Sequence, residues 1–474
     1  MSEKKANLVF IPFPILSHQA AAVELAKLLV DRDERLSITF IIMKLPTDTK
    51  VSPYPEIPRM NFVELPQSES NYAEWSKTPK FFLARFMESQ KSRVRDAVAE
   101  ILLNESNTNR ISGFVIDLLC TAMIDVVNEF GIPSYMYFIC GGAASLRLLF
   151  HLQSLTDDEN QDLMEYENSD VAISVPSFVD PVPAKVWPSD VFNQDGCFPY
   201  FIRKFRETKG IILNTFLEFE PHAVKSLLDD DKIPPVYPVG PMIQSRGGEI
   251  SDMNKRKHDE IIEWLDEQPD SSVVFLCFGS MGCFDGDQVK EIAVALENSG
   301  HRFLWSLRKP APKGKMQFPG EYENPGEVLS EGFLERTVGI GKIIGWAPQM
   351  AVLSHPAVGG FVCHCGWNSV HESVWCNVPM AVWPLAAEQQ LSAFQYVKEY
   401  GMAVEIKIDY RAGCNVIVEA DKIEKAIRQL MDPESKVRVK VKEFQEKSRM
   451  AMMKGESSYN FLGSLIDDFM GNIS

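Results

Sequence analysis

The chain has 474 residues, and 45% of them are hydrophobic, which is enough for large cores in two or three domains. Its formal net charge is −17 and no extended basic stretch offsets it, so nucleic acids and anionic membranes are poor partners. The nine cysteines include no C-x-x-C pair, and no window reaches the ~20 uninterrupted apolar residues of a membrane span. We therefore expect a soluble, cytoplasmic protein with reduced thiols.

The amino-terminal residues imitate a secretion signal. Lys4 and Lys5 precede a mostly apolar stretch, as the charged and hydrophobic parts of a signal peptide would. Pro12 and Pro14 interrupt that stretch. The cytoplasmic interpretation is therefore favoured over the secretory one.

The first predicted elements are a buried strand at residues 8–12 and a helix at residues 19–30. His18 lies between them, at the carboxyl end of the strand and beside the amino end of the helix. A lone histidine is more often structural than catalytic, so this position alone leaves both roles open. The absence of G-x-G-x-x-G after this strand argues against an NAD-dependent reductase.

A later strand, predicted at residues 113–117, ends in Asp117. A carboxylate that closes an apolar strand is seldom core filler. Because the carboxyl ends of parallel strands share one crevice, we expect Asp117 and His18 to meet there. A histidine held by an aspartate is the arrangement of a general base, since the carboxylate fixes the tautomer and stabilises the imidazolium.

Residues 171–205 contain five prolines among aromatic side chains. This composition suits an irregular wall over a pocket, and a packed surface loop is an equally good interpretation. Position alone makes five residues candidates for the wall of an acceptor site. They are Phe13, Leu119, Phe138, Trp187 and Tyr200.

A second domain is predicted after residues 245–260, which are polar, lack an apolar period and read as a linker. It opens with a strand at residues 273–278, followed by the turn Gly279-Ser280-Met281-Gly282. Backbone N–H groups and the Ser280 hydroxyl suit a phosphate, although a plain strand–helix turn explains the pattern as well.

The most informative stretch of this domain runs from Trp346 to Gln389. Residues 358–363 have the pattern of a buried strand, and His364, Cys365 and Gly366 interrupt it before a predicted helix. We expect Asn368 and Ser369 to cap that helix, so that its free N–H groups and dipole form an anion site. Two cysteines flanking His364 do not suggest a metal site, because adjacent strand residues point to opposite faces.

Side chains on both sides of this turn suit the other parts of a nucleotide sugar. Glu372 lies one helical turn beyond Asn368, where its carboxylate can accept two ribose hydroxyls. Trp346, with Ala347 and Gln349 beside it, offers a face on which a base would gain roughly 1–3 kcal/mol by stacking. Glu388 and Gln389 suit sugar hydroxyls.

These residues resemble the donor-binding signature of plant UDP-dependent glycosyltransferases. The matching positions are W-A-P-Q at 346–349, H-x8-H-C-G-W-N-S from His355, Glu372 three residues after Ser369, W-P at 383–384 and E-Q at 388–389. Asn377 stands where that signature usually has Gly, which we expect to affect a turn rather than a sugar contact. Ser17 replaces the usual Gly before the histidine.

The resemblance implies a site and a mechanism. It assigns UDP-sugar binding to Ser280, Trp346, Ala347, Gln349, His364, Gly366, Trp367, Asn368, Ser369, Glu372, Glu388 and Gln389, and the base to His18 with Asp117. It implies a single displacement with inversion, with UDP-glucose as co-substrate and neither a cofactor nor a metal. Gln389 and Trp367 point within the family to glucose. The first half of the chain resembles the branch that acts on flavonoids and other phenylpropanoids in plant secondary metabolism.

We therefore expect an α/β protein with two Rossmann-like doubly wound domains facing across a cleft, the GT-B fold of this family. The predicted parts are an acceptor domain at 1–244, the linker at 245–260, a UDP-sugar domain at 261–455 and a helix at 456–474 that returns to the first domain. The predicted activity is metal-independent O-glucosylation of small phenolic acceptors by a monomer. The alternative is a nucleotide-sugar-binding protein without turnover.

Overall fold

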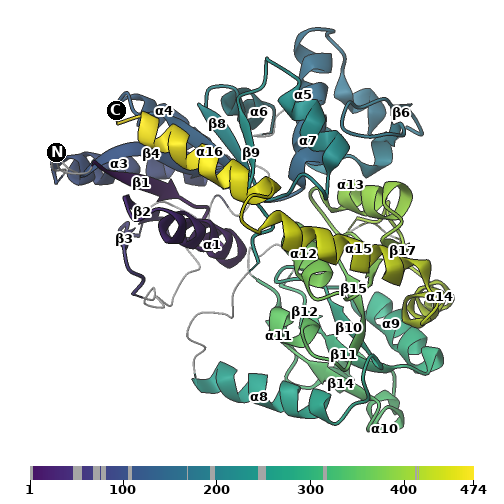
Figure 1. The fold of residues 1–474 in the computed structure, drawn as a ribbon. Helices are drawn as coiled ribbons and strands as arrows, with labels where there is room; N and C mark the ends of the chain where they lie inside the picture. The colour runs from purple at the N-terminus through teal and green to yellow at the C-terminus, as the bar shows by residue number, and fades with distance from the viewer. Residues whose placement is uncertain are drawn as a thin grey trace.

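The computed structural model describes residues 4–45, 56–67, 75, 82–104, 109–167, 169–192, 198–243, 252–312, 318–411, 414 and 416–473. Within these residues the chain builds two parallel sheets, each flanked by helices (Figure 1). The first half of the sequence, purple to teal, forms one sheet, and the green part forms the other. The predicted α/β class with two doubly wound sheets is confirmed.

The first sheet has the strand order β3-β2-β1-β4-β5-β8-β9. Its strands are β1 Lys5–Ile11, β2 Leu36–Ile42, β3 Met60–Glu64, β4 Asn109–Asp117, β5 Ser134–Phe138, β8 Gly210–Leu213 and β9 Val236–Pro238. Strand β1 is buried from its second residue onward, as expected for a parallel strand covered on both faces. The chain builds β2 and β3 on one side of β1 and then crosses to β4 on the other. The order therefore reverses between β1 and β4, where open α/β sheets bind ligands.

The second sheet repeats this plan with the order β14-β11-β10-β15-β16-β17. Its strands are β10 Val273–Cys277, β11 Arg302–Ser306, β14 Gly341–Ile344, β15 Val358–Cys363, β16 Met380–Val382 and β17 Ala403–Glu405. The order reverses between β10 and β15, so the second sheet has its own switch point there. Two short antiparallel pairs lie outside the sheets: β6 Ala172–Ile173 with β7 Val182–Pro183, and β12 Arg308–Lys309 with β13 Gly320–Glu321.

Helices cover both sheets. Those of the first half are α1 Leu16–Arg32, α3 Phe82–Leu103, α4 Ala122–Asn128, α5 Gly142–Asp157, α6 Phe198–Phe205 and α7 Pro221–Leu228. Those of the second half are α8 Asp252–Asp266, α9 Gly286–Ser299, α10 Phe333–Arg336, α11 Gln349–Leu353, α12 Trp367–Trp375, α13 Gln389–Phe394, α14 Ala420–Met431, α15 Lys436–Ala451 and α16 Ser457–Gly471. Short helical turns are η2 Leu118–Cys120, η3 Leu163–Tyr166, η4 Ala184–Val186, η5 Ser189–Phe192, η6 Pro325–Glu327 and the π-helical η7 Gln395–Glu399.

The last helix, α16, lies against the first sheet rather than the second (Figure 1). Leu465 and Phe469 are buried in the core that contains β1, and the Phe469 ring meets Tyr135 of β5 edge-on with centroids 4.6 Å apart. Helix α8 begins at Asp252, so the second half of the predicted linker is helical. The first half, residues 245–251, lies outside the described residues. The domain boundaries stay a prediction.

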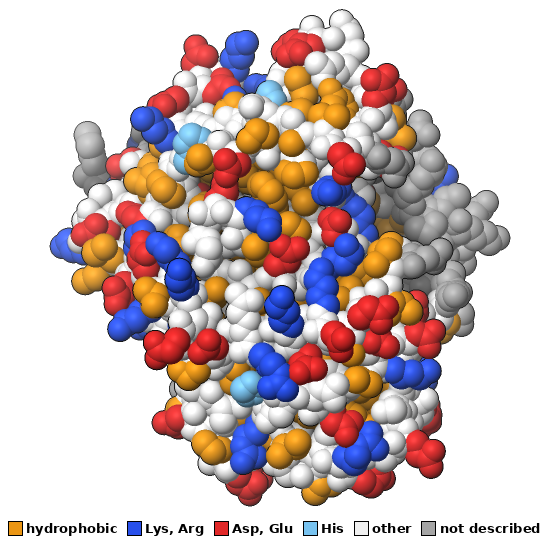
Figure 2. Space-filling model, turned by 90° about the vertical axis from the view of Figure 1, so that its right-hand side faces the viewer, with side chains coloured by type: hydrophobic (Ala, Val, Ile, Leu, Met, Phe, Trp, Pro, Cys, Tyr) orange, Lys and Arg blue, Asp and Glu red, His pale blue; other side chains and the backbone are white. Residues whose placement is uncertain are grey.

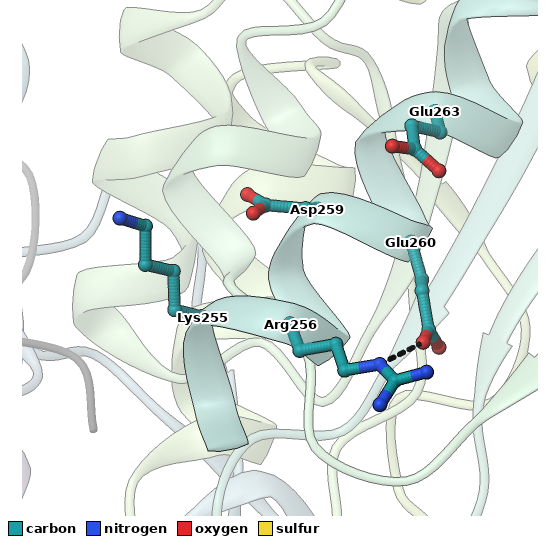
Figure 3. Close-up of a pocket in the computed structure, with 5 residues that line it drawn as sticks. All are labelled: Lys255, Arg256, Asp259, Glu260 and Glu263. Carbon is teal, nitrogen blue, oxygen red and sulfur yellow. Dashed lines mark hydrogen bonds and ion pairs between the residues drawn. The ribbon is translucent and has the colours of Figure 1, made fainter. Parts of the chain in front are cut away.

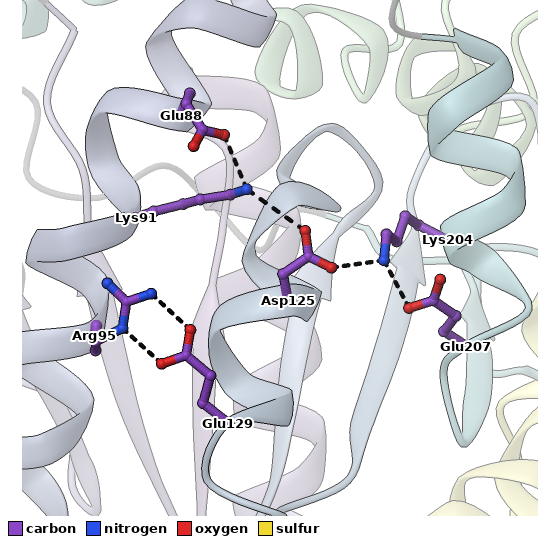
Figure 4. Close-up of polar contacts among 7 residues, drawn as sticks. All are labelled: Glu88, Lys91, Arg95, Asp125, Glu129, Lys204 and Glu207. Atoms are coloured by element: carbon purple, nitrogen blue, oxygen red, sulfur yellow. Dashed lines mark hydrogen bonds and ion pairs between the residues drawn. The ribbon is translucent and has the colours of Figure 1, made fainter.

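An ion-pair network joins α3, α4 and α6 (Figure 4). Asp125 of α4 lies 3.5 Å from the ammonium nitrogen of Lys91 on α3 and 2.6 Å from that of Lys204 on α6. Arg95 of α3 donates two hydrogen bonds of 2.7 and 2.6 Å to Glu129 at the end of α4. Exposed pairs contribute little singly, but a connected set contributes more and links the three helices.

Charge is mixed on the surface. On the face in Figure 2, Lys and Arg side chains alternate with Asp and Glu. None of the helices in the described ranges combines the length and the apolar character that crossing a membrane requires.

Candidate active site

The first switch point brings His18 and Asp117 together. His18 lies in the first turn of α1, the helix that follows β1, and Asp117 is the last residue of the adjacent strand β4. The Nδ1 atom of His18 lies 2.8 Å from Oδ2 of Asp117. The contact that the sequence predicted is therefore present.

Asp117 is held by more than the histidine. Its side chain is 2% exposed, and Oδ1 accepts the backbone N–H of Leu119 at 2.9 Å. With both carboxylate oxygens accepting, Nδ1 of His18 must carry the proton, and Nε2 of the neutral ring is left as an acceptor. The His18 side chain is 11% exposed, so the ring keeps access to a ligand. This arrangement can remove a proton from a bound hydroxyl.

The predicted acceptor residues divide into two groups. Phe13 meets the His18 ring edge-on with centroids 5.6 Å apart, and Leu119 follows the catalytic candidate Asp117; both side chains are half-buried. Phe138 and Trp187 are buried in the first core and offer no face to a ligand. The side chain of Tyr200 lies outside what the structure describes.

The second switch point holds His364 between two glycines. Gly279, after β10, has φ +73°, and a Cβ there would lie 2.7 Å from the His364 ring. A Cβ on Gly366 would lie 2.4 Å from Nε2 of the same ring. Burial lowers the pKa of His364 to about 4, so the ring is neutral, and its Nδ1 has no partner among the described residues. Ser280, on the same turn, is exposed.

The start of α12 differs from the prediction. The helix begins at Trp367 with Gly366 as its N-cap, so Asn368 and Ser369 are first-turn residues and not caps. Gly366 takes the extended conformation that a cap requires, while the two polar side chains bond to other segments. The first intrahelical bond runs from Val370 N to Gly366 O, which leaves the N–H groups of residues 367–369 without a helical partner. The anion-binding character of the helix start is unaffected.

Gln349, Ser369 and Glu372 form a polar cluster between α11 and α12. The amide nitrogen of Gln349 lies 2.9 Å from Oγ of Ser369 and 2.7 Å from Oε2 of Glu372. Burial raises the pKa of Glu372 to about 7, against the hydrogen bond from Gln349, which lowers it. The carboxyl group therefore titrates near neutral pH.

Trp346 offers the aromatic face, and its backbone is bonded by Glu321, a residue that the sequence did not reveal. The Trp346 side chain is 38% exposed, and Ala347 beside it is buried. The backbone N–H of Trp346 donates to Oε1 of Glu321 at 3.0 Å. Glu321, in the short strand β13, also lies 2.7 Å from the ammonium group of Lys257. A Cβ on Gly345 would lie 2.3 Å from the Glu321 carboxyl carbon, so a larger residue there would require this side chain to move.

The predicted sugar-binding pair, Glu388 and Gln389, lies where the two halves meet. A Cβ on Gly141 of the first half would lie 2.9 Å from Cγ of Glu388. Burial raises the pKa of Glu388, against a backbone hydrogen bond, which lowers it. Oε1 of Gln389 accepts the N–H groups of Leu385 and Ala386 at 2.9 and 3.0 Å, which leaves its NH2 group as a donor.

Trp367 is placed differently from the other predicted donor residues. Its indole is buried, with Nε1 donating to the carbonyl oxygen of Asn214 at 2.5 Å and the ring edge-on to Phe219. Both partners belong to the first half of the chain. The side chain therefore packs between the halves, and only the backbone lies at the helix start.

The described residues also form a hollow that contains none of the predicted site residues. This hollow, on α8, is lined by charged side chains alone (Figure 3), which are Lys255, Arg256, Asp259, Glu260 and Glu263. Within the described ranges, no three His, Cys, Asp or Glu side chains lie close enough together to hold a metal ion.

The chain is similar to known proteins along nearly its whole length. Residues 232–436 match the family described as UDP-glucoronosyl and UDP-glucosyl transferase. The chain is 51% identical over 480 residues to UDP-glucose flavonoid 3-O-glucosyltransferase 6 of Fragaria ananassa, covering 98% of this chain and 99% of that protein. It is 53% identical over 476 residues to UDP-glycosyltransferase 71E1 of Stevia rebaudiana, covering 98% of each.

Solved structures agree with these relatives. A crystal structure of a transferase from Siraitia grosvenorii in complex with UDP superposes with a TM-score of 0.89 at 44% identity, covering 98% of this chain and 100% of that one. The Medicago truncatula protein UGT71G1, complexed with UDP-glucose, superposes with a TM-score of 0.86 at 41% identity, covering 98% and 99%.

Proposed function

Because the chain belongs to the UDP-glucoronosyl and UDP-glucosyl transferase family, it is a glycosyltransferase, and we propose that it transfers glucose from UDP-glucose to the hydroxyl of a small phenolic acceptor. The observation that carries the chemistry is the 2.8 Å contact between His18 and Asp117 at the first switch point. The acceptor class includes flavonoids, phenylpropanoids and similar hydroxylated compounds. The name of the Fragaria relative supports it, as does the Phe13 ring that lies edge-on to His18.

The proposed reaction is one displacement with inversion. Nε2 of His18 takes the proton of the acceptor hydroxyl, and the acceptor oxygen bonds to the anomeric carbon of glucose as the bond to the UDP oxygen breaks. A phenol has a pKa near ~10, so a modest base suffices to help ionise it. Asp117 stabilises the imidazolium that forms.

The charge of the departing diphosphate falls on the start of α12. The unpaired N–H groups of residues 367–369 and the positive end of the helix dipole act there, with the side chains of Asn368 and Ser369 and the neutral ring of His364. Ser280, on the neighbouring turn, is the other proposed phosphate contact. These donors explain how departure can proceed without a metal ion.

The remaining contacts to UDP-glucose are proposed from the geometry of the second switch point. Trp346, with Ala347 and Gln349, is proposed to bind the uracil, Glu372 the ribose hydroxyls, and Glu388 with Gln389 the glucose hydroxyls. The complex of the Medicago protein with UDP-glucose supports this donor. The position of Glu388 beside Gly141 of the first half supports a glucose position between the base and the second domain. We propose UDP-glucose as the co-substrate, with no other cofactor, in a cytoplasmic monomer.

The alternative is a protein that binds a nucleotide sugar without turnover. A binding protein has no need of a proton acceptor, so the fixed tautomer of His18 favours the enzyme. Retained UDP binding with no product from any acceptor would favour the alternative.

Mass spectrometry of a mixed phenolic panel incubated with UDP-glucose tests the proposal. Wild type and His18→Ala are assayed side by side, with EDTA present and absent. We expect hexose adducts with wild type in both buffers and a loss of roughly 10²–10⁴-fold in His18→Ala, with UDP binding retained. Equal turnover by the two proteins would remove His18 from the mechanism, and abolition by EDTA would remove the metal-independent step.

A further inference from the structure

Asn214 connects the two halves of the molecule at the start of α12. It is fully buried and directly follows β8 of the first sheet. Its side-chain nitrogen lies 3.1 Å from Oδ1 of Asn368, and its carbonyl oxygen accepts the Trp367 indole N–H. Its side-chain oxygen accepts the backbone N–H of Met242 at 2.8 Å. One first-half residue thus contacts the first two residues of the helix that receives the diphosphate.

The chemistry of these groups fixes the orientation of both amides. The N–H of Met242 can only donate, so the Asn214 atom facing it must be the oxygen. The NH2 group of Asn214 therefore faces Asn368, and because NH2 only donates, the facing atom of Asn368 must be its oxygen. The NH2 group of Asn368 is left over, and it donates to no other group within the described ranges.

We call the two successive hydrogen bonds, from Met242 to Asn214 and from Asn214 to Asn368, the relay. The backbone around Met242, where the relay begins, is itself hydrogen-bonded on several sides. Val239 N–H donates to Leu213 O at 3.1 Å, and Gly240 N–H donates to Thr215 O at 2.7 Å. A Cβ on Gly240 would lie 2.8 Å from Oδ1 of Asn214, so the segment packs closely against this side chain. Ser458 of α16 donates to Gly240 O at 2.6 Å. The N–H that orients Asn214 is thus held on several sides.

We propose that Asn214 is a positioning residue that acts through Asn368 to present an N–H donor, and not an oxygen, to the diphosphate of the nucleotide sugar. This rests on the proposed function, because it assigns how that donor site is built. A free asparagine can offer either end of its amide, and an oxygen turned toward a phosphate would repel it. The bond from Asn214 leaves Asn368 only the favourable orientation.

Asn214→Asp reverses the relay. One carboxylate oxygen still accepts the Met242 N–H, while the other faces Asn368 and can only accept. Asn368 must then turn its NH2 group toward residue 214 and its oxygen toward the diphosphate. We expect the affinity for UDP, measured by titration calorimetry, to fall by roughly 10–100-fold, the worth of a hydrogen bond to a charged group. The affinity for uridine, which lacks the diphosphate, is expected to stay within about twofold.

A double-mutant cycle separates the relay from a direct effect of the new charge. In an Asn368→Ala background no amide can be turned, so Asn214→Asp is expected to cost UDP affinity no more than about twofold further. Loss of the full factor in that background would mean that the charge itself repels UDP and would overturn the relay. Asn377→Asp, the same substitution at an exposed turn after α12, is the matched control and is expected to leave both affinities unchanged.

If Asn214→Asp does not fold, Asn214→Leu replaces it, because leucine has nearly the same shape and cannot orient Asn368. This variant is expected to weaken the affinity for UDP by roughly 3–10-fold and to leave the affinity for uridine unchanged. Unchanged UDP affinity in the folded variants, with wild type binding UDP, would refute the relay alone. Failure of wild type to bind UDP at all would instead remove the proposed function and the relay with it.

Discussion

Nδ1 of His18 lies 2.8 Å from Oδ2 of Asp117, and the other oxygen of that carboxylate accepts the Leu119 N–H at 2.9 Å. The second bond makes Asp117→Asn a sharp test. The Leu119 N–H selects the amide oxygen, so the NH2 group faces His18 and donates to Nδ1. The ring then carries its proton on Nε2, where it cannot accept one from a phenol.

We expect the kcat of Asp117→Asn to fall by roughly 10²–10⁴-fold, with UDP affinity unchanged. Steady-state kinetics with UDP-glucose and a phenolic acceptor, beside UDP titration, measures both. Asp117→Ala, which removes the carboxylate and leaves the tautomer free, is the companion variant. An Asn variant with wild-type kcat would show that Asp117 does not set the tautomer.

That contact was predictable because it depends only on chain order. A residue after the first strand and a residue ending the next strand across the switch point meet by the rules of parallel sheets. Asn214 and Glu321 were not predictable in this way. Each reaches the site from another segment, and no local pattern says which side chain will touch Asn368 or Trp346.

Burial was the other limit of the sequence. The motif that contains Trp367 and the position of Phe138 at a strand end both suggested exposure to a ligand. In the structure the Trp367 ring packs against Phe219 of the other half, and Phe138 packs against Phe205. Which face of a helix or strand meets a distant segment depends on tertiary packing. The caps predicted at Asn368 and Ser369 failed for a related reason, since both side chains bond across to other elements.

Glu372 gives donor binding a pH dependence. Burial raises the pKa of its carboxyl group to about 7, and a ribose is best bound by the ionised form, which can accept two hydroxyls. Uridine affinity is therefore expected to rise as pH increases from 6 to 8, by up to about tenfold per pH unit below the pKa. Calorimetric titration with uridine measures this without the titration of a phosphate. Glu372→Gln, which cannot ionise, is expected to bind weakly with a flat profile, and a pH-dependent profile in this variant would exclude Glu372 as its source.

Asn377 lies in an exposed turn after α12 with φ +59°, the left-handed region where Gly is at ease and Asn is the best tolerated of other residues. Asn377→Ala is expected to lose about 1 kcal/mol of folding stability, while Asn377→Gly stays within about 0.5 kcal/mol of wild type. Thermal denaturation compares the three. Glucosyl transfer is expected to be equal in all of them, and a changed donor KM in either variant would contradict a role confined to the turn.

The buried His371 ring, at the contact between the two halves, lowers the folding stability of the protein. It is 1% exposed, its ring lies 4.9 Å from that of Phe219 and 4.8 Å from that of Trp367, and neither ring nitrogen has a partner among the described residues. Burial lowers its pKa to about 3. Between its ordinary pKa of about 6.5 and pH 3, the ring is protonated in the unfolded chain and neutral in the folded protein. The free energy of unfolding is therefore unaffected by the protonation of His371 above pH 6.5 and decreases as the pH falls from 6.5 toward 3.

His371→Leu removes both the unpaired nitrogens and the titration. We expect the variant to be at least as stable as wild type at pH 7.5, and to gain about 2 kcal/mol relative to it at pH 5, since 1.5 pH units below 6.5 correspond to that difference. Thermal denaturation at the two pH values measures the change, with His222→Leu, at an exposed position on α7, as the control for the substitution itself. Equal pH dependence in wild type and His371→Leu would mean that the ring is paired in solution. A loss of stability at pH 7.5 would mean that its shape, and not its polarity, is what the contact requires.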